Sequence, residues 1–252
     1  MARGQRLGCC PGRHLQGLAG ARNVAQIASL NEAVTFVEEY NDDLEVLLQE
    51  RLDTNEWQEM TLDLSISADS IEINNVRRIL FAQGLWVGNY IRDQIQLSES
   101  HKSVCLAVGR YVQVQGYQAP GGLNCGIDFF VRGDDIRVTE INARWTGGLF
   151  PAELLKRLGA RAEHSVAFID MLNSDRMTDY LSLLRDNATT DSQARHGFRL
   201  VPMGFSPFLQ SIEEQPRIYV WQVVIGDFSR FQSAKRTKLG ANELPTADQI
   251  SL

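Results

Sequence analysis

The stretch from Asn124 to Gly148, NCGIDFFVRGDDIRVTEINARWTGG, decides the fold. Two apolar runs, 124–131 and 136–141, flank a polar tetrad, and short β-rich runs around a Gly/Asp turn are typical of a β-hairpin. Each run carries one acid where an apolar residue is expected, Asp128 in the first and Glu140 in the second. Because strand side chains alternate, Glu140 and Asn142 lie on one face of their strand.

The register of the hairpin decides whether Asp128 shares that face. A two-residue turn at 133–134 would pair Asp128 with Thr139 and separate the acids, whereas a three-residue loop at 133–135 would pair Asp128 with Glu140. Two carboxylates directly opposite each other repel unless a cation lies between them, and oxygen ligands of this kind suit Mg²⁺. The alternative is a solvated hairpin with ordinary surface acids, and a two-residue turn would argue for that alternative.

The same residues carry a resemblance. GIDF, a short turn and then EINARWTGG resemble the metal-binding hairpin of the ATP-grasp carboxylate–amine ligases. The resemblance implies an α+β protein with antiparallel sheets and flanking helices. It also implies that Asp128, Glu140 and Asn142 hold Mg²⁺ (or Mn²⁺) against the phosphates of ATP. Arg144 would stabilise an acyl phosphate, and the glycines at 147–148 would let backbone amides approach the substrate carboxylate.

The resemblance implies nucleotide-binding residues upstream of the hairpin as well. A glycine-containing stretch at 17–23 is similar to the loop that closes over ATP, since free backbone N–H groups can bind phosphate. The apolar run 44–49 is predicted to be a strand, and in this family such a strand leads to an adenine-binding hinge and then a ribose-binding acid. The residues that match the loop, the hinge and the ribose position are Gly17 and Gly20, then Gln49, Glu50 and Leu52, and finally Glu56.

The sequence departs from the family in one respect. ATP-grasp enzymes hold the ATP phosphates with lysines of the nucleotide lobe, but the first lysine here is Lys102. The irregular, Gly- and Arg-rich segment 1–23 stands where one such lysine is expected, and the N-terminal domain usual in the family is missing. We therefore expect either an ATP- and Mg²⁺-dependent ligase, working with a separate N-terminal domain or as a homo-oligomer, or a degenerate nucleotide-binding protein without catalysis.

Hydrophobic periodicity predicts the remaining organisation. The proposed domains are 1–23 (irregular), 24–82 (small nucleotide-binding lobe), 83–160 (larger lobe with the hairpin) and 161–252 (C-terminal α/β extension). Helices are predicted at 31–40, 100–115, 151–158, 162–172 and 179–184. Strands are predicted at 60–66, from 71, and over 76–81, 198–204, 217–225 and 228–232. Residues 84–90 are predicted to form a loop over the site, Arg77 and Arg78 to be solvated, and the tail 235–252 to fray.

Composition limits the class of protein. The 252 residues are 44% hydrophobic and 22% charged, as in soluble globular proteins. A net charge of −6 argues against a nucleic-acid partner, and no apolar run has the length of a membrane span. The four cysteines form no CxxC pair, which favours the reducing cytoplasm, and Cys105 and Cys125 are predicted to be buried. The expected partners are a small-molecule carboxylate and a small-molecule amine.

Overall fold

The computed structural model describes residues 28–39, 52–82, 85–92, 95–188, 197–212, 215–240, 250 and 252. It has the α+β architecture that the sequence predicts, a sheet with flanking helices. In chain order its elements are α1 (Leu30–Glu39), β1 (Gln58–Ile66), β2 (Ile71–Ala82), β3 (Leu85–Ile91), α2 (Glu99–Val114), β4 (Leu123–Arg132), β5 (Asp135–Asn142), α3 (Leu149–Arg157), β6 (Ser165–Asn173), the 3-10 turn η1 (Ser174–Arg176), α4 (Met177–Asn187), β7 (Phe198–Ile212), β8 (Gln215–Gly226) and α5 (Phe228–Leu239).

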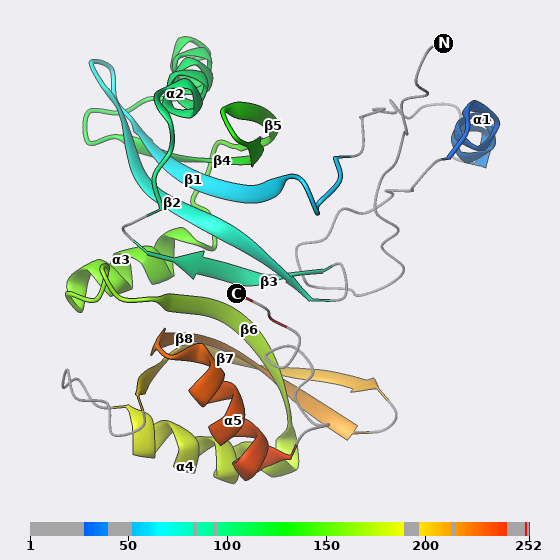
Figure 1. The fold of residues 1–252 in the computed structure, drawn as a ribbon, viewed down its shortest axis with the longest axis vertical. Helices are drawn as coiled ribbons and strands as arrows, with labels where there is room; N and C mark the ends of the chain where they lie inside the picture. Colours follow the sequence, from blue (N-terminus) through cyan, green and yellow to red (C-terminus); the bar gives the residue numbers. More distant parts are fainter. Residues whose placement is uncertain are drawn as a thin grey trace.

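The strands form one eight-stranded sheet in the order β5-β4-β1-β2-β3-β6-β8-β7. Every neighbouring pair is antiparallel. β3 and β6 join the two halves of the sheet at its middle, as Figure 1 shows. Gly88 pairs with Phe168 at this junction, and a Cβ on Gly88 would lie 2.0 Å from the carbonyl oxygen of Ala167. The junction therefore requires glycine at this position.

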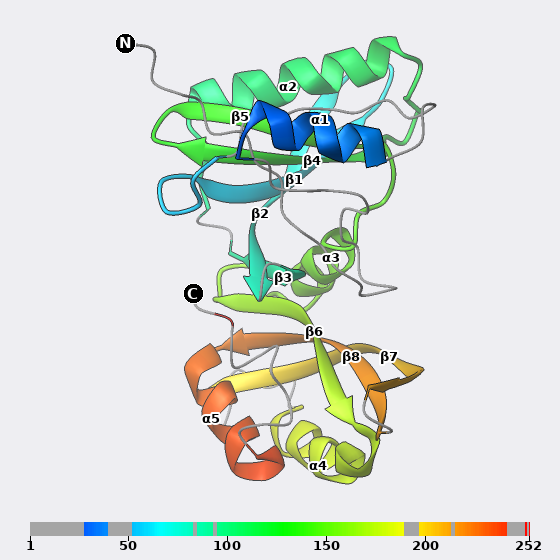
Figure 2. The same cartoon turned by 90° about the vertical axis from the view of Figure 1, so that its right-hand side faces the viewer.

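Helices cover the two ends of the molecule. α2 lies over the β1 and β4 end, whereas α4 and α5 lie at the β6, β7 and β8 end (Figures 1 and 2). Under α2, Leu62, Leu64, Ile127 and Phe129 have no exposed surface, and burying each such side chain contributes about 1.5–3 kcal/mol. These residues occupy one face of β1 and β4, so the alternating residues of the same strands point to the opposite face.

Two segments have a secondary structure different from the predicted one. The predicted helix at 162–172 is strand β6, whose residues are mostly buried, and a short apolar run that is buried on both faces has no distinguishing period. The predicted strand at 228–232 is helix α5, because the side chain of Asp227 accepts a hydrogen bond from the backbone N of Arg230 at 3.1 Å and caps the helix. Part of the predicted tail belongs to α5 too, and Lys235 in it is buried.

The predicted loop at 84–90 is also wrong, because Leu85–Ile91 is strand β3. Its Trp, Gly and Asn residues have the composition of a loop, but the glycine serves the close approach to β6. The other predicted elements that lie in the described residues are confirmed. Helix α3 is followed by Gly159 at φ +66°, as expected of a C-terminal glycine. The predicted strand at 44–49 lies outside the described residues.

Two general predictions can be compared with the structure. Cys105 and Cys125 are buried free thiols, as predicted. None of the helices in the described part of the chain combines the length and the apolar character needed to cross a membrane. The proposed domain boundaries stay predictions.

Candidate functional site

One side of the sheet, opposite α2, carries the candidate site. Thr61 pairs with Asp128 of β4 on one side and with Arg77 of β2 on the other, and Asp128 pairs with Glu140 of β5. Directly paired residues share a face, so these side chains form a continuous polar surface across four strands. A cleft of about 650 Å³ lies over this surface. Its lining residues are Glu59, Thr61, Arg77, Ile79, Phe81, Trp86, Asn89, Asp128, Glu140, Asn142, Arg144, Thr146, Gly147 and Gly148.

The hairpin turn differs from the one that the metal hypothesis required. Arg132 pairs with Asp135, so the turn has two residues and the predicted three-residue loop is wrong. The register then shifts between Asp128 and Phe129, which leaves Thr139 as an extra residue of a β-bulge. Because of this bulge Asp128 pairs with Glu140 after all. The turn length that was expected to exclude the paired acids therefore does not exclude them.

The three predicted metal ligands come together in the structure. The side-chain Nδ2 of Asn142 donates a hydrogen bond to Oδ2 of Asp128 at 3.3 Å. Burial raises the pKa of Asp128, and the charge of Glu140 raises it further, although a hydrogen bond from Thr61 and the charge of Arg77 act in the opposite direction. A cation beside these oxygens would remove the repulsion between the two carboxylates.

A third acid, Glu59, lies beside this pair and was not predicted from the sequence. Burial raises the pKa of Glu59 to about 7, and the negative charge of Asp128 contributes to that rise. Glu59, Thr61 and Asp63 alternate with Met60, Leu62 and Leu64 along β1. That alternation of polar with apolar residues is the signal that could have identified them as one row on the side of the sheet that carries the cleft.

The donor set is compatible with Mg²⁺ but is small. Among the residues that the structure describes, no group of three or more His, Cys, Asp and Glu side chains is arranged to hold a metal ion. The predicted set contains two carboxylates, Asp128 and Glu140, and one amide oxygen, that of Asn142. Mg²⁺ commonly takes one or two protein carboxylates and completes its octahedral shell with phosphate oxygens and water. The residues therefore fit Mg²⁺ in the presence of a phosphate ligand.

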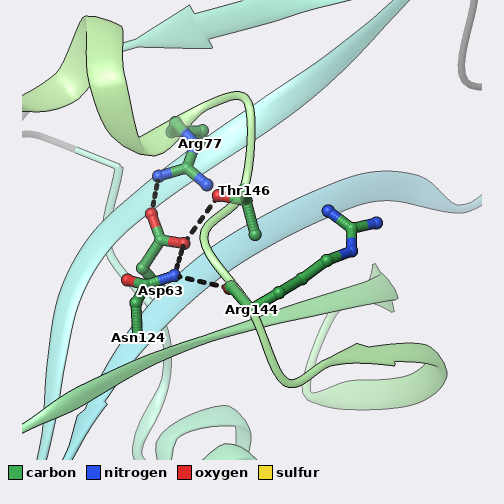
Figure 3. A network of polar contacts seen from close by, with 5 residues as sticks. All are labelled: Asp63, Arg77, Asn124, Arg144 and Thr146. Carbon is green, nitrogen blue, oxygen red and sulfur yellow. Dashed lines mark hydrogen bonds and ion pairs between the residues drawn. The ribbon is translucent and has the colours of Figure 1, made fainter.

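A buried ion pair anchors the loop that follows the hairpin (Figure 3). Asp63 accepts hydrogen bonds from Arg77 Nη1, from Asn124 Nδ2 at 3.2 Å and from Thr146 Oγ1 at 2.8 Å. The prediction that Arg77 is solvated is wrong, because its side chain is only 1% exposed. Asp63 compensates the charge of Arg77 from the neighbouring strand. Asn124 also donates to the carbonyl oxygen of Arg144 at 3.1 Å, so the network holds both ends of the loop.

Arg77 also contacts the start of α3. A Cβ on Gly148, the residue that precedes this helix, would lie 2.5 Å from Nε of Arg77. Two guanidinium nitrogens of Arg77, Nε and Nη2, are buried without a hydrogen-bond partner among the described residues. The cleft wall thus contains two unpartnered N–H donors of an ion-paired arginine beside a helix N-terminus, and both features favour a ligand that accepts hydrogen bonds.

Arg144 lines the cleft from the loop between β5 and α3. In Figure 3 its side chain extends away from Asp63 and Arg77. Arg144 is exposed and makes no ion pair within the described part of the chain. The alternative interpretation of this residue, an ordinary surface ion pair, therefore finds no acidic partner there.

The predicted nucleotide residues are only partly described. Gly17, Gly20, Gln49 and Glu50 lie outside the described residues. Leu52 is half-buried. Glu56 is exposed, and its carboxylate accepts a hydrogen bond from Arg132 Nη1 at 2.8 Å; it lines a second cleft of about 450 Å³. Three residues of the main cleft, Glu59, Ile79 and Phe81, line this second cleft too, which places Glu56 next to the candidate site.

Comparison with known proteins rests on structure alone. No family model matches the sequence, and no curated protein matches it either. The structure is similar to N5-carboxyaminoimidazole ribonucleotide synthetase from Thermus thermophilus, with a TM-score of 0.52 and 13% identity over 88% of this chain and 60% of that one. The N5-carboxyaminoimidazole synthetase from Staphylococcus aureus matches with a TM-score of 0.46 and 12% identity over 86% of this chain and 58% of that one. The biotin carboxylase domain of a single-chain bacterial carboxylase matches with a TM-score of 0.47 and 13% identity over 90% of this chain and 54% of that one.

The chain therefore spans about 60% of the length of the Thermus enzyme. At 13% identity the match concerns the backbone arrangement and not the chemistry of individual side chains. It agrees with the antiparallel sheet, its flanking helices and the hairpin of β4 and β5. With these observations together, the chain has the ATP-grasp fold.

Proposed function

We propose that this chain is an ATP- and Mg²⁺-dependent ligase that joins a carboxylate to an amine through an acyl phosphate. The observation that carries the proposal is the pairing of Asp128 with Glu140 in a cleft that Arg144 also lines. Two carboxylates that face each other repel unless a proton or a cation lies between them, and an arginine that has no acidic partner in the described part of the chain suits a phosphate. The ATP-grasp fold makes ATP the expected source of that phosphate.

In this proposal Asp128, Glu140 and Asn142 hold Mg²⁺, which supplies positive charge beside the phosphates of ATP when it is bound. The hydrogen bond that Asn142 donates to Asp128 turns the amide nitrogen toward the carboxylate and leaves the amide oxygen for the metal. The nearby carboxylate of Glu59 has a pKa of about 7. It can therefore release its proton near neutral pH when a cation enters the site.

The two arginines have different roles. Arg144 is exposed in the cleft and binds the phosphoryl group as it passes from ATP to the substrate carboxylate. Arg77 is fixed by its ion pair with Asp63, and its Nε and Nη2 offer hydrogen-bond donors at the start of α3. The amine then attacks the acyl carbon, its nitrogen loses a proton, and inorganic phosphate leaves. The protein contributes mostly position and charge neutralisation to these steps.

The ATP-grasp fold also suggests where the nucleotide and the substrates bind. The adenosine part of ATP would contact the hinge at Gln49, Glu50 and Leu52, with Glu56 near the ribose. Breaking the ion pair between Glu56 and Arg132 would free the Glu56 carboxylate for that contact. The substrates are a small carboxylate and a small amine, and the cytoplasm is the proposed location. A separate N-terminal domain or a second copy of the chain would supply further contacts.

The test is ATP binding by calorimetry, with and without Mg²⁺, on the wild type and on Glu140→Ala. We expect Mg²⁺ to tighten binding in the wild type, and the substitution to weaken the Mg²⁺-dependent binding about tenfold or more, as expected for one lost charge-assisted contact. Glu72→Ala removes an exposed acid of the same sheet and should bind like the wild type. Binding that ignores both Mg²⁺ and the Glu140 substitution would refute the metal site.

One observation favours a second candidate, a nucleotide-binding protein without catalysis. None of the described residues that line the cleft is a lysine, and Lys102 lies on α2, where it pairs with Glu99 at 2.7 Å. A panel of carboxylates and amines, with hydroxylamine added to trap acyl phosphates, separates the two candidates. Carboxylate-dependent formation of ADP and hydroxamate supports the ligase. Tight Mg²⁺·ATP binding without either product supports the second candidate.

A further inference from the structure

A small cavity beside α3 is separate from the cleft. It has a volume of about 90 Å³, and it shares no lining residue with the main cleft. Because a water molecule occupies about 30 Å³ in the liquid, the cavity has room for about three waters or one small tetrahedral oxyanion. The residues that line it are Asn74, Asn75, Val76, Ile91, Arg92, Ile95, Ala152 and Arg161.

A bulge in β2 places two asparagines at this cavity. Asp63 pairs with Asn75 but Leu64 pairs with Ile73, so Asn74 is an extra residue between them. Val76 keeps its place opposite Leu62 in the core. Asn75 therefore shares the face of Asp63, away from the core, and the bulge takes Asn74 out of the ladder. Asn74 is exposed whereas its neighbour is buried, which connects the cavity with solvent.

Two hydrogen-bond donors at the cavity lack an acceptor among the described residues. Asn75 is 6% exposed, and its Nδ2 has no partner. Nε of Arg92 is likewise buried and without a partner. Buried donors in folded proteins are almost always paired, so these two groups indicate a ligand that accepts hydrogen bonds.

The charge of the cavity selects the kind of acceptor. Arg92 contributes a positive charge, and none of the described residues in the lining is acidic. Guanidinium groups bind phosphate oxygens with paired, charge-assisted hydrogen bonds. We propose that this cavity is a second ligand site, in which Asn75 and Arg92 bind a phosphate group, either as inorganic phosphate or as the head of a phosphate monoester.

The experiment titrates the full chain with inorganic phosphate at constant ionic strength, followed by calorimetry and by ¹H–¹⁵N spectra. We expect saturable binding that shifts the side-chain amide signal of Asn75 and the Nε–H signal of Arg92. Glycerol 3-phosphate in a second titration distinguishes the sources. If glycerol 3-phosphate competes with inorganic phosphate, the site accepts a phosphate head group. If inorganic phosphate alone binds, the site is one for the free ion.

Variants separate this cavity from the cleft. Asn75→Leu keeps the approximate side-chain size but removes the donor, and Arg92→Gln removes the charge; each should weaken phosphate binding about tenfold or more. Arg110→Gln removes an exposed arginine of α2 and should leave the affinity within about twofold. Circular dichroism and Mg²⁺·ATP binding report whether each variant is folded.

Three outcomes would overturn the proposal. The first is the absence of saturable phosphate binding to the wild type. The second is equal affinity in folded Asn75→Leu and Arg92→Gln. The third is phosphate binding that disappears in Arg144→Gln while the Asn75 and Arg92 signals never move, because the ion would then occupy the main cleft.

Discussion

Replacing Glu59 with glutamine tests the electrostatics of the cleft directly. The carboxylate is partly buried beside Asp128, and these two causes raise its pKa from 4.5 to about 7. The folded protein therefore binds more protons than the unfolded chain between pH 4.5 and pH 7. Stability is then lost as the pH rises through this window, by about 1.4 kcal/mol per pH unit. Over the whole window the loss is roughly 3 kcal/mol.

Glu59→Gln keeps the shape of the side chain and removes its titration. Relative to the wild type, the variant should gain roughly 3 kcal/mol in unfolding free energy between about pH 4.5 and about pH 8. Urea unfolding at half-unit pH intervals measures this difference, with Glu72→Gln as the control for loss of an exposed acid in the same sheet. A difference that stays constant with pH, or that changes in the opposite direction, would refute the reasoning.

The same experiment reports on the proposed cation. Mg²⁺ with a non-hydrolysable ATP analogue would stabilise the charged form of Glu59 and lower its pKa. The wild-type stability should then fall less steeply with pH. The unfolding free energy of Glu59→Gln should rise by the same amount at every pH, so that its pH dependence stays unchanged. An unchanged wild-type slope at saturating analogue would mean that no cation lies near Glu59 and Asp128.

Three further substitutions test the packing around the cleft. Asp63→Ala leaves the guanidinium of Arg77 buried and unpaired and should destabilise the protein by about 3–5 kcal/mol in urea unfolding; a loss below about 1 kcal/mol would mean that water replaces the carboxylate. Gly148→Ala should lower the unfolding free energy by about 1–3 kcal/mol because the new Cβ meets Arg77. Gly147→Ala, whose Cβ would have its nearest atom at 3.9 Å, should lower it by less than about 0.5 kcal/mol. Equal losses would refute the contact. Gly88→Ala should lose about 3 kcal/mol or more and lower the thermal midpoint, and a wild-type midpoint would contradict the close approach of β3 to β6.

The hairpin and its acids could be predicted because their signals are local. The turn residues and the apolar runs define the two strands, and Glu140 and Asn142 lie on one face through the strand period alone. Asp63 and Arg77 could not be paired in this way. Their contact depends on the register between β1 and β2, which a bulge shifts nearby. Arginines in strands are usually exposed, and nothing in the sequence near Arg77 marks it as a buried one.

The wrongly predicted elements lack a clear hydrophobic period. β6 is buried on both faces and α5 is short and follows a Gly-Asp turn, so hydrophobic period does not identify either. Packing decides β6, which pairs with β3 on one side and β8 on the other, whereas the cap at Asp227 starts α5. Glycine has a similar effect in β3, where Gly88 lowers strand propensity but allows contact with β6. Tertiary contacts therefore outweigh local preference in β3 and β6.

The bulge at Thr139 explains why turn length was a poor test of the candidate metal site. A two-residue turn fixes the register only as far as the ladder is regular. Here Thr139 leaves the ladder, and its hydroxyl donates to the carbonyl oxygen of Asp128 at 3.0 Å, which holds the bulge next to the acids. The bulge restores the pairing of Asp128 with Glu140. The quantity that decides whether two strand acids can share a cation is their register at the acids themselves, and a bulge can set that register independently of the turn.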